Sequence, residues 1–196
     1  VDPFRQAICS VSRVAGPVVG SGFLLGGTDL LVTDSSILAA LGQGFDLGVK
    51  AEVRPFAGGA ERQAELVLAP QTVLDFAVFK VPNLIEASPL RLANELPDVD
   101  ELVTACISVG EAQGFHDGKV TRVNCSVRMG MGAGSGRVET ISNLIETDIK
   151  VEPGACGSPL VRKDGRVVGV LVGGNGHSYA LTALRLQKML TESGLL

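Results

Sequence analysis

The sequence predicts an all-β protein, and three observations lead to that prediction. Short runs of β-branched and aliphatic residues recur along the 196 residues. Glycine, aspartate and asparagine separate these runs, and glycine alone accounts for 25 residues. A helical spacing of apolar residues is found only near the C-terminus. Strands of this length and spacing are typical of a β-barrel or a β-sandwich.

The individual strands follow from the apolar runs between turn signals. A tight hairpin is expected at Lys163-Asp164-Gly165-Arg166 and a second at Asn175-Gly176, because both sequences suit two-residue turns. The predicted strands are Val18–Leu25, Leu30–Thr33, Ala51–Pro55, Phe76–Val81, Leu102–Val109, Val120–Val127, Val138–Ile141, Leu144–Ile149, Val167–Val172 and Ser178–Thr182.

The C-terminal segment has a different pattern. Leu184, Leu186, Met189 and Leu190 recur over about two helical turns, which predicts a helix over residues 184–191. The stretch from Ala87 to Asp100 contains prolines and acidic residues and is the best candidate for a connection between two halves.

Composition excludes several classes of protein. Hydrophobic residues make up 45% and charged residues 19%, which excludes a disordered chain. The net charge is −4 and no run of Lys or Arg is present, so we expect no nucleic-acid partner and no anionic membrane partner. No apolar run reaches the roughly 18–20 residues of a membrane span. The N-terminus lacks a signal sequence, and a soluble protein is expected.

The four cysteines carry no metal-binding spacing. Cys9, Cys106 and Cys125 lie inside apolar runs, which predicts buried thiols. No C-x-x-C pair occurs and only two histidines are present, so neither a zinc site nor a cofactor is expected. This pattern favours a reducing compartment such as the cytoplasm.

Three motifs carry more specific information. They are G-S-G-F-L-L at residues 20–25 followed by L-L-V-T-D-S-S-I-L at 30–38, then L-D-F-A-V-F-K-V at 74–81, and finally E-T-D at 146–148 with P-G-A-C-G-S-P-L at 153–160 and G-R-V-V-G-V at 165–170. In order and separation they resemble the trypsin-like proteases of the HtrA type, and the resemblance covers residues 20–190.

The resemblance implies a chymotrypsin-like double six-stranded β-barrel with a short C-terminal helix. The chain would then form a single trypsin-like peptidase domain over residues 1–196. Its N-terminal barrel would occupy about residues 1–86 and its C-terminal barrel about residues 100–182, followed by the helix at 184–191.

The catalytic positions depart from the family pattern. The family reads T-N-A-H where this chain has T-D-S-S, so Ser36 stands at the histidine position. Cys156 stands at the position of the serine nucleophile, and Asp75 matches the catalytic aspartate. A serine hydroxyl does not act as a base near neutral pH, and without an imidazole beside it the thiol of Cys156 is not activated. We therefore expect residual activity at most.

Two binding features of the family are retained. The resemblance implies that the backbone N–H groups of Gly154 and Cys156 form an oxyanion hole. The alternative is that the glycines are present only because the turn needs their backbone freedom. Val172, Gly173 and Gly174 correspond to the edge that pairs with the substrate main chain. Lys150 falls near the base of the specificity pocket, or else faces solvent.

Both histidines are expected in exposed turns. His116 lies in G-F-H-D-G, a predicted hairpin tip, and His177 follows Asn175-Gly176 near the wall of the cleft. A displaced catalytic base at His177 and a two-histidine metal site are the functional alternatives.

Three functions remain open. The leading hypothesis is a pseudoprotease whose fold is retained for binding a peptide, a partner protein or a neighbouring domain of a longer chain. The second is an active endopeptidase with Cys156 as nucleophile and an unusual base, or an enzyme altered by substitution at these positions. The third is a module for a small ligand or a metal on the same scaffold.

Overall fold

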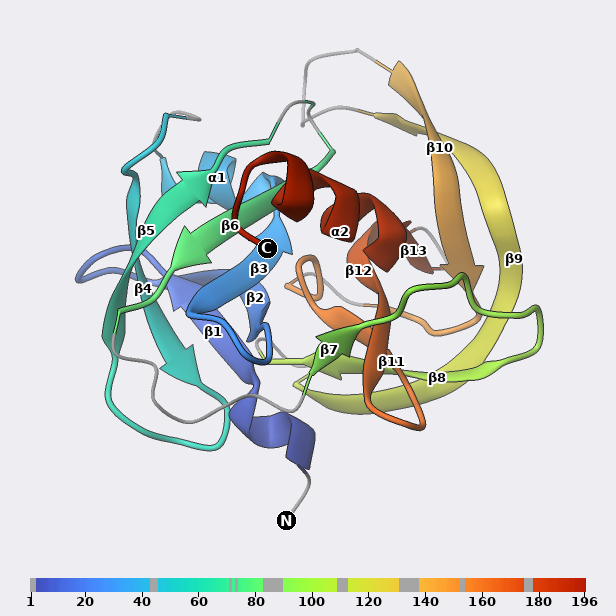
Figure 1. The fold of residues 1–196 in the computed structure, drawn as a ribbon, viewed down its shortest axis with the longest axis horizontal. Coiled ribbons are helices and arrows are strands. Elements are labelled where there is room, and N and C mark those ends of the chain that lie inside the picture. The colour runs from blue at the N-terminus through green and yellow to red at the C-terminus, as the bar shows by residue number, and fades with distance from the viewer. Residues whose placement is uncertain are drawn as a thin grey trace.

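A computed structural model describes residues 3–42, 46–70, 72, 74–82, 90–108, 113–130, 138–151, 154–174 and 178–196. Two β-barrels lie side by side, with one longer helix in front of them (Figure 1). In chain order the elements are η1 (Pro3–Gln6), β1 (Ile8–Ser12), β2 (Val18–Leu24), β3 (Leu30–Asp34), α1 (Ser36–Leu41), β4 (Lys50–Pro55), β5 (Arg62–Leu68), β6 (Phe76–Lys80), β7 (Arg91–Leu92), β8 (Leu102–Ile107), β9 (Gly114–Gly130), β10 (Val138–Thr147), β11 (Pro159–Arg162), β12 (Arg166–Gly174), β13 (Ser178–Thr182) and α2 (Ala183–Glu192).

The first barrel is closed by six strands in the order β1-β2-β3-β6-β5-β4. Closure follows because β1 pairs with β2 on one side and with β4 on the other. The strands turn alternate side chains inward: in β5, Ala64 and Leu66 are buried between the exposed Gln63 and Glu65. This alternation gives the barrel a core of its own.

The second barrel also contains six strands, in the order β11-β8-β9-β10-β13-β12, and pairing of β11 with β12 closes it. The short strand β7 adds to β12 in parallel. The hairpin predicted at residues 163–166 joins β11 to β12, and Gly165 adopts the positive φ of 87° that such a turn requires. The predicted all-β double barrel with a C-terminal helix is thus confirmed.

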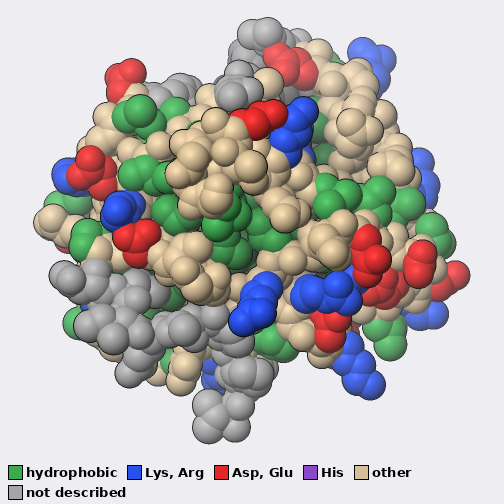
Figure 2. Space-filling model, viewed as in Figure 1, with side chains coloured by type: hydrophobic (Ala, Val, Ile, Leu, Met, Phe, Trp, Pro, Cys, Tyr) green, Lys and Arg blue, Asp and Glu red, His purple; other side chains and the backbone are tan. Residues whose placement is uncertain are grey.

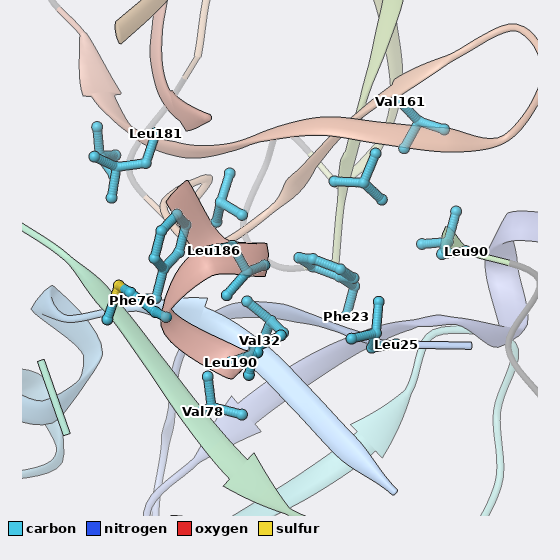
Figure 3. Close-up of a cluster of buried hydrophobic side chains, with 14 of the residues drawn as sticks. Phe23, Leu25, Val32, Phe76, Val78, Leu90, Val161, Leu181, Leu186 and Leu190 are labelled. Carbon is cyan, nitrogen blue, oxygen red and sulfur yellow. The ribbon is translucent and has the colours of Figure 1, made fainter. Parts of the chain in front are cut away.

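Helix α2 extends one residue beyond each end of the predicted range. The hydroxyl of Thr182 caps it by accepting the backbone N–H of Arg185 at 3.3 Å. In Figure 3, Leu186 and Leu190 of α2 lie among Phe76 and Val78 of the first barrel. Val161 and Leu181 of the second barrel belong to the same buried cluster. One hydrophobic core therefore joins both barrels and the helix. Within the described ranges, no helix is long and apolar enough to cross a membrane.

Two local predictions were wrong. His116 does not lie at a hairpin tip, because β9 runs through residues 114–118 and His116 pairs with Ala105 of β8. Gly118 is there for close packing, since a Cβ at this position would lie 2.4 Å from Ile149. The two strands predicted over residues 138–149 are the single strand β10. Its register shifts next to Asn143, which has a positive φ of 59°.

Several elements were not predicted from the sequence, namely β1, β5, β7, β11 and α1. The predicted hairpin at Asn175-Gly176 lies outside the described residues, although β12 and β13 on either side of it pair in antiparallel fashion. The burial predicted for Cys9, Cys106 and Cys125 is confirmed.

Charged side chains of both signs stand next to one another on the part of the surface formed by the second barrel (Figure 2). In this half of the chain the buried Arg162 forms ion pairs with Glu95 at 2.9 Å and with Glu101 at 2.6 Å. Both glutamates lie in the segment that leads from the first barrel to the second. Arg162 therefore links this connecting segment to β11 through two ion pairs.

Candidate active site

Ser36 is the first residue of α1, and one residue, Ser35, separates it from the end of β3. Its side chain is exposed and donates a hydrogen bond to Oδ1 of Asp34 at 2.9 Å. Its backbone N–H donates to Oδ2 of the same carboxylate at 3.2 Å. The residue at the histidine position thus closes a local turn with Asp34, which itself has no exposed surface.

Asp75 lies directly before β6, and its backbone is bound to Ser35 in both directions. The Ser35 N–H donates to the Asp75 carbonyl at 2.8 Å, and the Asp75 N–H donates to the Ser35 hydroxyl at 3.1 Å. The Asp75 side chain is 1% exposed, and its Oδ1 lies 3.1 Å from Nη2 of Arg185 in α2. The structure therefore brings the Asp75 and Ser36 segments together and places an arginine against the Asp75 carboxylate.

Cys156 lies in a turn that is pressed against the first barrel. Gly157, the next residue, has a φ of 86°, and a Cβ there would lie 2.2 Å from the Ser21 carbonyl oxygen and 2.2 Å from the Thr33 hydroxyl. Only glycine allows this approach of the turn to β2 and β3. The hydroxyl of Ser21 also donates to the Gly154 carbonyl at 3.1 Å. The Cys156 turn is thus held at the junction of the two barrels.

Ser21 also connects the turn to the second barrel. The backbone N–H of Ser108, which follows β8, donates to the Ser21 hydroxyl at 3.2 Å, and all of these atoms are buried. The Ser108 hydroxyl in turn donates to the Cys9 carbonyl of β1 at 2.6 Å. A buried chain of hydrogen bonds therefore runs from β1 through Ser108 and Ser21 to Gly154.

Two backbone N–H groups of the turn donate to no backbone carbonyl among the residues that the structure describes. The Gly157 N–H donates to the Leu171 carbonyl at 2.8 Å, and the Ser158 N–H donates to the Ala155 carbonyl at 3.0 Å. Among the described residues, neither the Gly154 N–H nor the Cys156 N–H donates to a backbone carbonyl. Gly154 has a φ of 98°, a conformation that glycine adopts without strain.

The electrostatic environment of Cys156 opposes ionisation. Burial and, to a smaller extent, the negative charge of Asp34 raise the pKa of the thiol to about 12, although the backbone N–H of Cys156 acts in the opposite direction. At pH 7, far below that pKa, very little of the thiol is ionised. The thiolate is the nucleophilic form of cysteine, so this thiol is poorly suited to attack a peptide carbonyl.

Asp34 is itself perturbed. Burial raises the pKa of its carboxyl group to about 6, while the hydrogen bonds from Ser36 and from its own backbone lower it. The carboxylate therefore gains its charge between about pH 5 and pH 7, beside the thiol of Cys156.

The expected peptide-binding edge lies at the end of β12. The N–H and the carbonyl of Leu171 are both used, by Ser158 and Gly157 respectively. Beyond Leu171, Gly173 pairs with Tyr179 and Gly174 with Ser178 of β13, and a bulge separates Leu171 from Gly173. No other described strand pairs with residues 172–174. Val172 is buried, and Gly173 has a φ of 124°.

The remaining candidate residues are His177, Pro153 and Lys150. His177 and Pro153 lie outside the described residues, so the hypothesis of a displaced base stays a hypothesis. Lys150 is exposed, in agreement with the simpler of its two interpretations. Among the residues that the structure describes, no three His, Cys, Asp or Glu side chains gather as they would around a metal ion.

Comparison with known proteins decides the family. The family model described as a trypsin-like peptidase domain matches residues 20–170. The chain belongs to this family. Among curated relatives, the trypsin-like chain is 33% identical over 119 residues to "Serine protease Do-like HtrA" of Bacillus subtilis, a match that spans 57% of this chain and 25% of that protein. It is 26% identical over 197 residues to "Serine protease HTRA1A" of Danio rerio, spanning 98% of this chain and 38% of that protein. The chain thus spans well under half the length of both relatives.

Solved structures agree on the fold of the trypsin-like domain. A crystal structure of Rv3671c from M. tuberculosis, a mutant in the inactive form, has a TM-score of 0.74 at 21% identity and covers 98% of this chain and 88% of that one. The protease domain of MamO from Magnetospirillum magneticum, in its apo form, also has a TM-score of 0.74, at 19% identity, with 97% of each chain covered. At such identities the likeness establishes the fold alone.

Three residues of the site were missed by sequence reasoning. The signal for Asp34 is its departure from the asparagine of the family motif. Ser21 lies within the first motif, where nothing in the pattern assigns it a role. Arg185 gave no signal, since nothing in the sequence links the first turn of the C-terminal helix to Asp75.

Proposed function

We propose that this trypsin-like domain is catalytically impaired and that its cleft binds an extended peptide or protein segment. The observation that carries the proposal is the surroundings of Cys156, where Ser36 stands in place of the histidine and the Asp34 carboxyl group adds negative charge. The Ser36 hydroxyl is no base near pH 7, and both oxygens of the Asp34 carboxylate already accept hydrogen bonds from Ser36.

Catalysis by the retained parts alone is expected to be weak. Removing one member of a serine–histidine–aspartate unit leaves roughly 10³–10⁴-fold acceleration over the uncatalysed reaction. Here the histidine position holds Ser36, and the half-buried Cys156 lies in the field of the Asp34 carboxylate. The backbone N–H groups of Gly154 and Cys156, which donate to no backbone carbonyl among the described residues, are the candidate donors for a carbonyl or an anion.

Binding of a main chain requires none of the missing chemistry. The edge of β12 over residues 172–174 has a partner on one side only among the described strands. An extended segment adds to such an edge through backbone hydrogen bonds, and side-chain pockets then set the preference. The occupant is a peptide, a partner protein or a neighbouring domain of a longer chain.

Amide-shift mapping by NMR tests the binding half of the proposal. A pool of unstructured casein peptides added to the labelled domain is expected to move the resonances of residues 154–157 and 172–174. Cys156→Ala keeps every backbone donor and is expected to bind the same peptides, so it serves as the matched control. Shifts confined to the opposite face of the second barrel, with both segments unmoved, would contradict the proposal.

A further inference from the structure

Asp75 presents a physical problem that the proposed function leaves open. Its side chain is 1% exposed, and the family position it occupies is normally paired with the catalytic imidazole, which this chain lacks at residue 36. A carboxylate removed from water is costly unless an opposite charge accompanies it. We infer that Arg185 has replaced the imidazole as the partner of Asp75, and that this ion pair positions α2 on the first barrel.

The geometry of Arg185 suits that role. It lies in the first turn of α2, where its backbone N–H binds the cap residue Thr182 at 3.3 Å. The guanidinium reaches Oδ1 of Asp75 at 3.1 Å, and the arginine side chain is 35% exposed. A partly exposed guanidinium therefore places its positive charge beside the buried carboxylate.

The ion pair stands next to the hydrophobic attachment of the same helix. Phe76 and Val78 of β6 follow Asp75 in the chain, and Leu186 and Leu190 of α2 pack in the cluster that contains them (Figure 3). Asp75 and Arg185 thus join the same two elements that the apolar contacts join. The helix is fixed at its first turn by charge and along its length by packing.

This arrangement has a consequence for the catalytic site. In a catalytic triad, the aspartate stabilises the imidazolium because the negative charge of the aspartate is available to the imidazolium. Arg185 already neutralises that charge, so a histidine placed at residue 36 would meet a carboxylate with a competing partner. Restoring the base by Ser36→His is therefore insufficient while Arg185 is present, whether or not the cleft binds peptides.

Urea unfolding of three variants tests the positioning role. Arg185→Met removes the positive charge beside the buried carboxylate and is expected to lower the midpoint clearly. Asp75→Asn leaves a partly exposed guanidinium and is expected to cost less. The double variant is expected to be more stable than Arg185→Met alone, because the buried negative charge is removed as well. Lys188→Met on the same helix removes an exposed pair with Glu192 and is the control, with an unchanged midpoint.

The double variant also decides the outcome if Arg185→Met does not fold. Rescue of folding by Asp75→Asn supports the inference in its strongest form. Failure of that rescue, or equal midpoints for Arg185→Met and Lys188→Met, would overturn it.

The pKa of a histidine introduced at residue 36 provides a second test, because general destabilisation of the fold does not change it. The pKa of the imidazole introduced by Ser36→His is followed by NMR, with and without Arg185→Met. We expect the pKa to be higher by about one unit or more when Arg185 is removed, since the Asp75 charge then acts on the imidazole alone. Equal pKa values in the two backgrounds would show that Arg185 does not compete for Asp75.

Discussion

At Asp34, burial and hydrogen bonding act on one carboxyl group in opposite directions. Burial is the larger effect, and it raises the pKa of the group to about 6 despite the two hydrogen bonds from Ser36. Above that pH the carboxylate is charged and disfavours a second negative charge on Cys156. A residue that is absent from the family's catalytic set therefore adds to the effect of burial in opposing ionisation of the thiol at the nucleophile position.

Asp34→Asn is expected to accelerate alkylation of Cys156 by iodoacetamide severalfold at pH 8. The substitution removes the charge that raises the thiol pKa, while burial, the larger cause, remains. The unmodified domain should react slowly, with a rate that still rises between pH 8 and pH 10 because the pKa is about 12. Mass spectrometry of the Cys156 peptide measures the rate separately from the three buried cysteines.

Asp46→Asn, at an exposed position, serves as the control and should leave the alkylation rate unchanged. If Asp34→Asn also leaves it unchanged, charge repulsion at Cys156 is not the cause of the low reactivity.

Single residues of the site were predictable where a motif surrounds them. Ser36, Asp75 and Cys156 each stand in a recognisable stretch, so their chemical types could be compared with the family pattern. The partners Asp34 and Arg185 were not predicted, because burial and pairing decide their roles. Arg185 and Asp75 lie on different elements far apart in the chain, and their contact arises only once α2 packs on β6.

The turn that contains Cys156 shows how elements of the two barrels are fitted together. Its backbone approaches β2 and β3 so closely that residue 157 has no room for a side chain. Ser21 of β2 then fixes the Gly154 carbonyl by a hydrogen bond from its hydroxyl. The position of the backbone donors in the turn thus depends on the first barrel as well as on the second.

Gly157→Ala is expected to destabilise the domain by about 2–4 kcal/mol, because the new methyl group meets the Ser21 carbonyl and the Thr33 hydroxyl at 2.2 Å. Gly58→Ala is the matched control, since Gly58 has a φ of 89° and open space around its Cβ position. That control should cost only the backbone strain of about 1–2 kcal/mol. Chemical denaturation measures both, and equal losses would mean that the turn is not pressed against the first barrel.

Elements were predictable where apolar runs are continuous and unpredictable where polar residues interrupt them. In β5 the exposed Gln63 and Glu65 alternate with buried residues, so the strand has only the short apolar run Leu66–Leu68, although its pattern is that of a barrel wall. Glycine residues gave the opposite error, a turn predicted where the structure has a strand. Gly118 suggested a turn beside His116, yet its role is to admit Ile149 against β9.

At the scale of the whole molecule, the trypsin-like fold is intact while residues 36 and 156 depart from the family's catalytic pattern. The core that joins both barrels to α2 is assembled from residues such as Phe23, Val32, Leu186 and Leu190, none of which takes part in catalysis. The fold therefore persists independently of the identity of residues 36 and 156. This separation explains why the double barrel could be predicted from sequence, whereas the activity could not.

A proteolysis assay tests the central claim most directly. The domain is incubated with denatured, fluorescently labelled casein at pH 7, beside Cys156→Ala as a control with the same fold and backbone donors. We predict that the two proteins release fluorescence at the same background rate, because Ser36 is no base and burial together with the Asp34 charge keeps the thiol of Cys156 protonated at this pH. Robust cleavage by the unmodified domain that Cys156→Ala abolishes would contradict the account and make His177 the first candidate for the missing base.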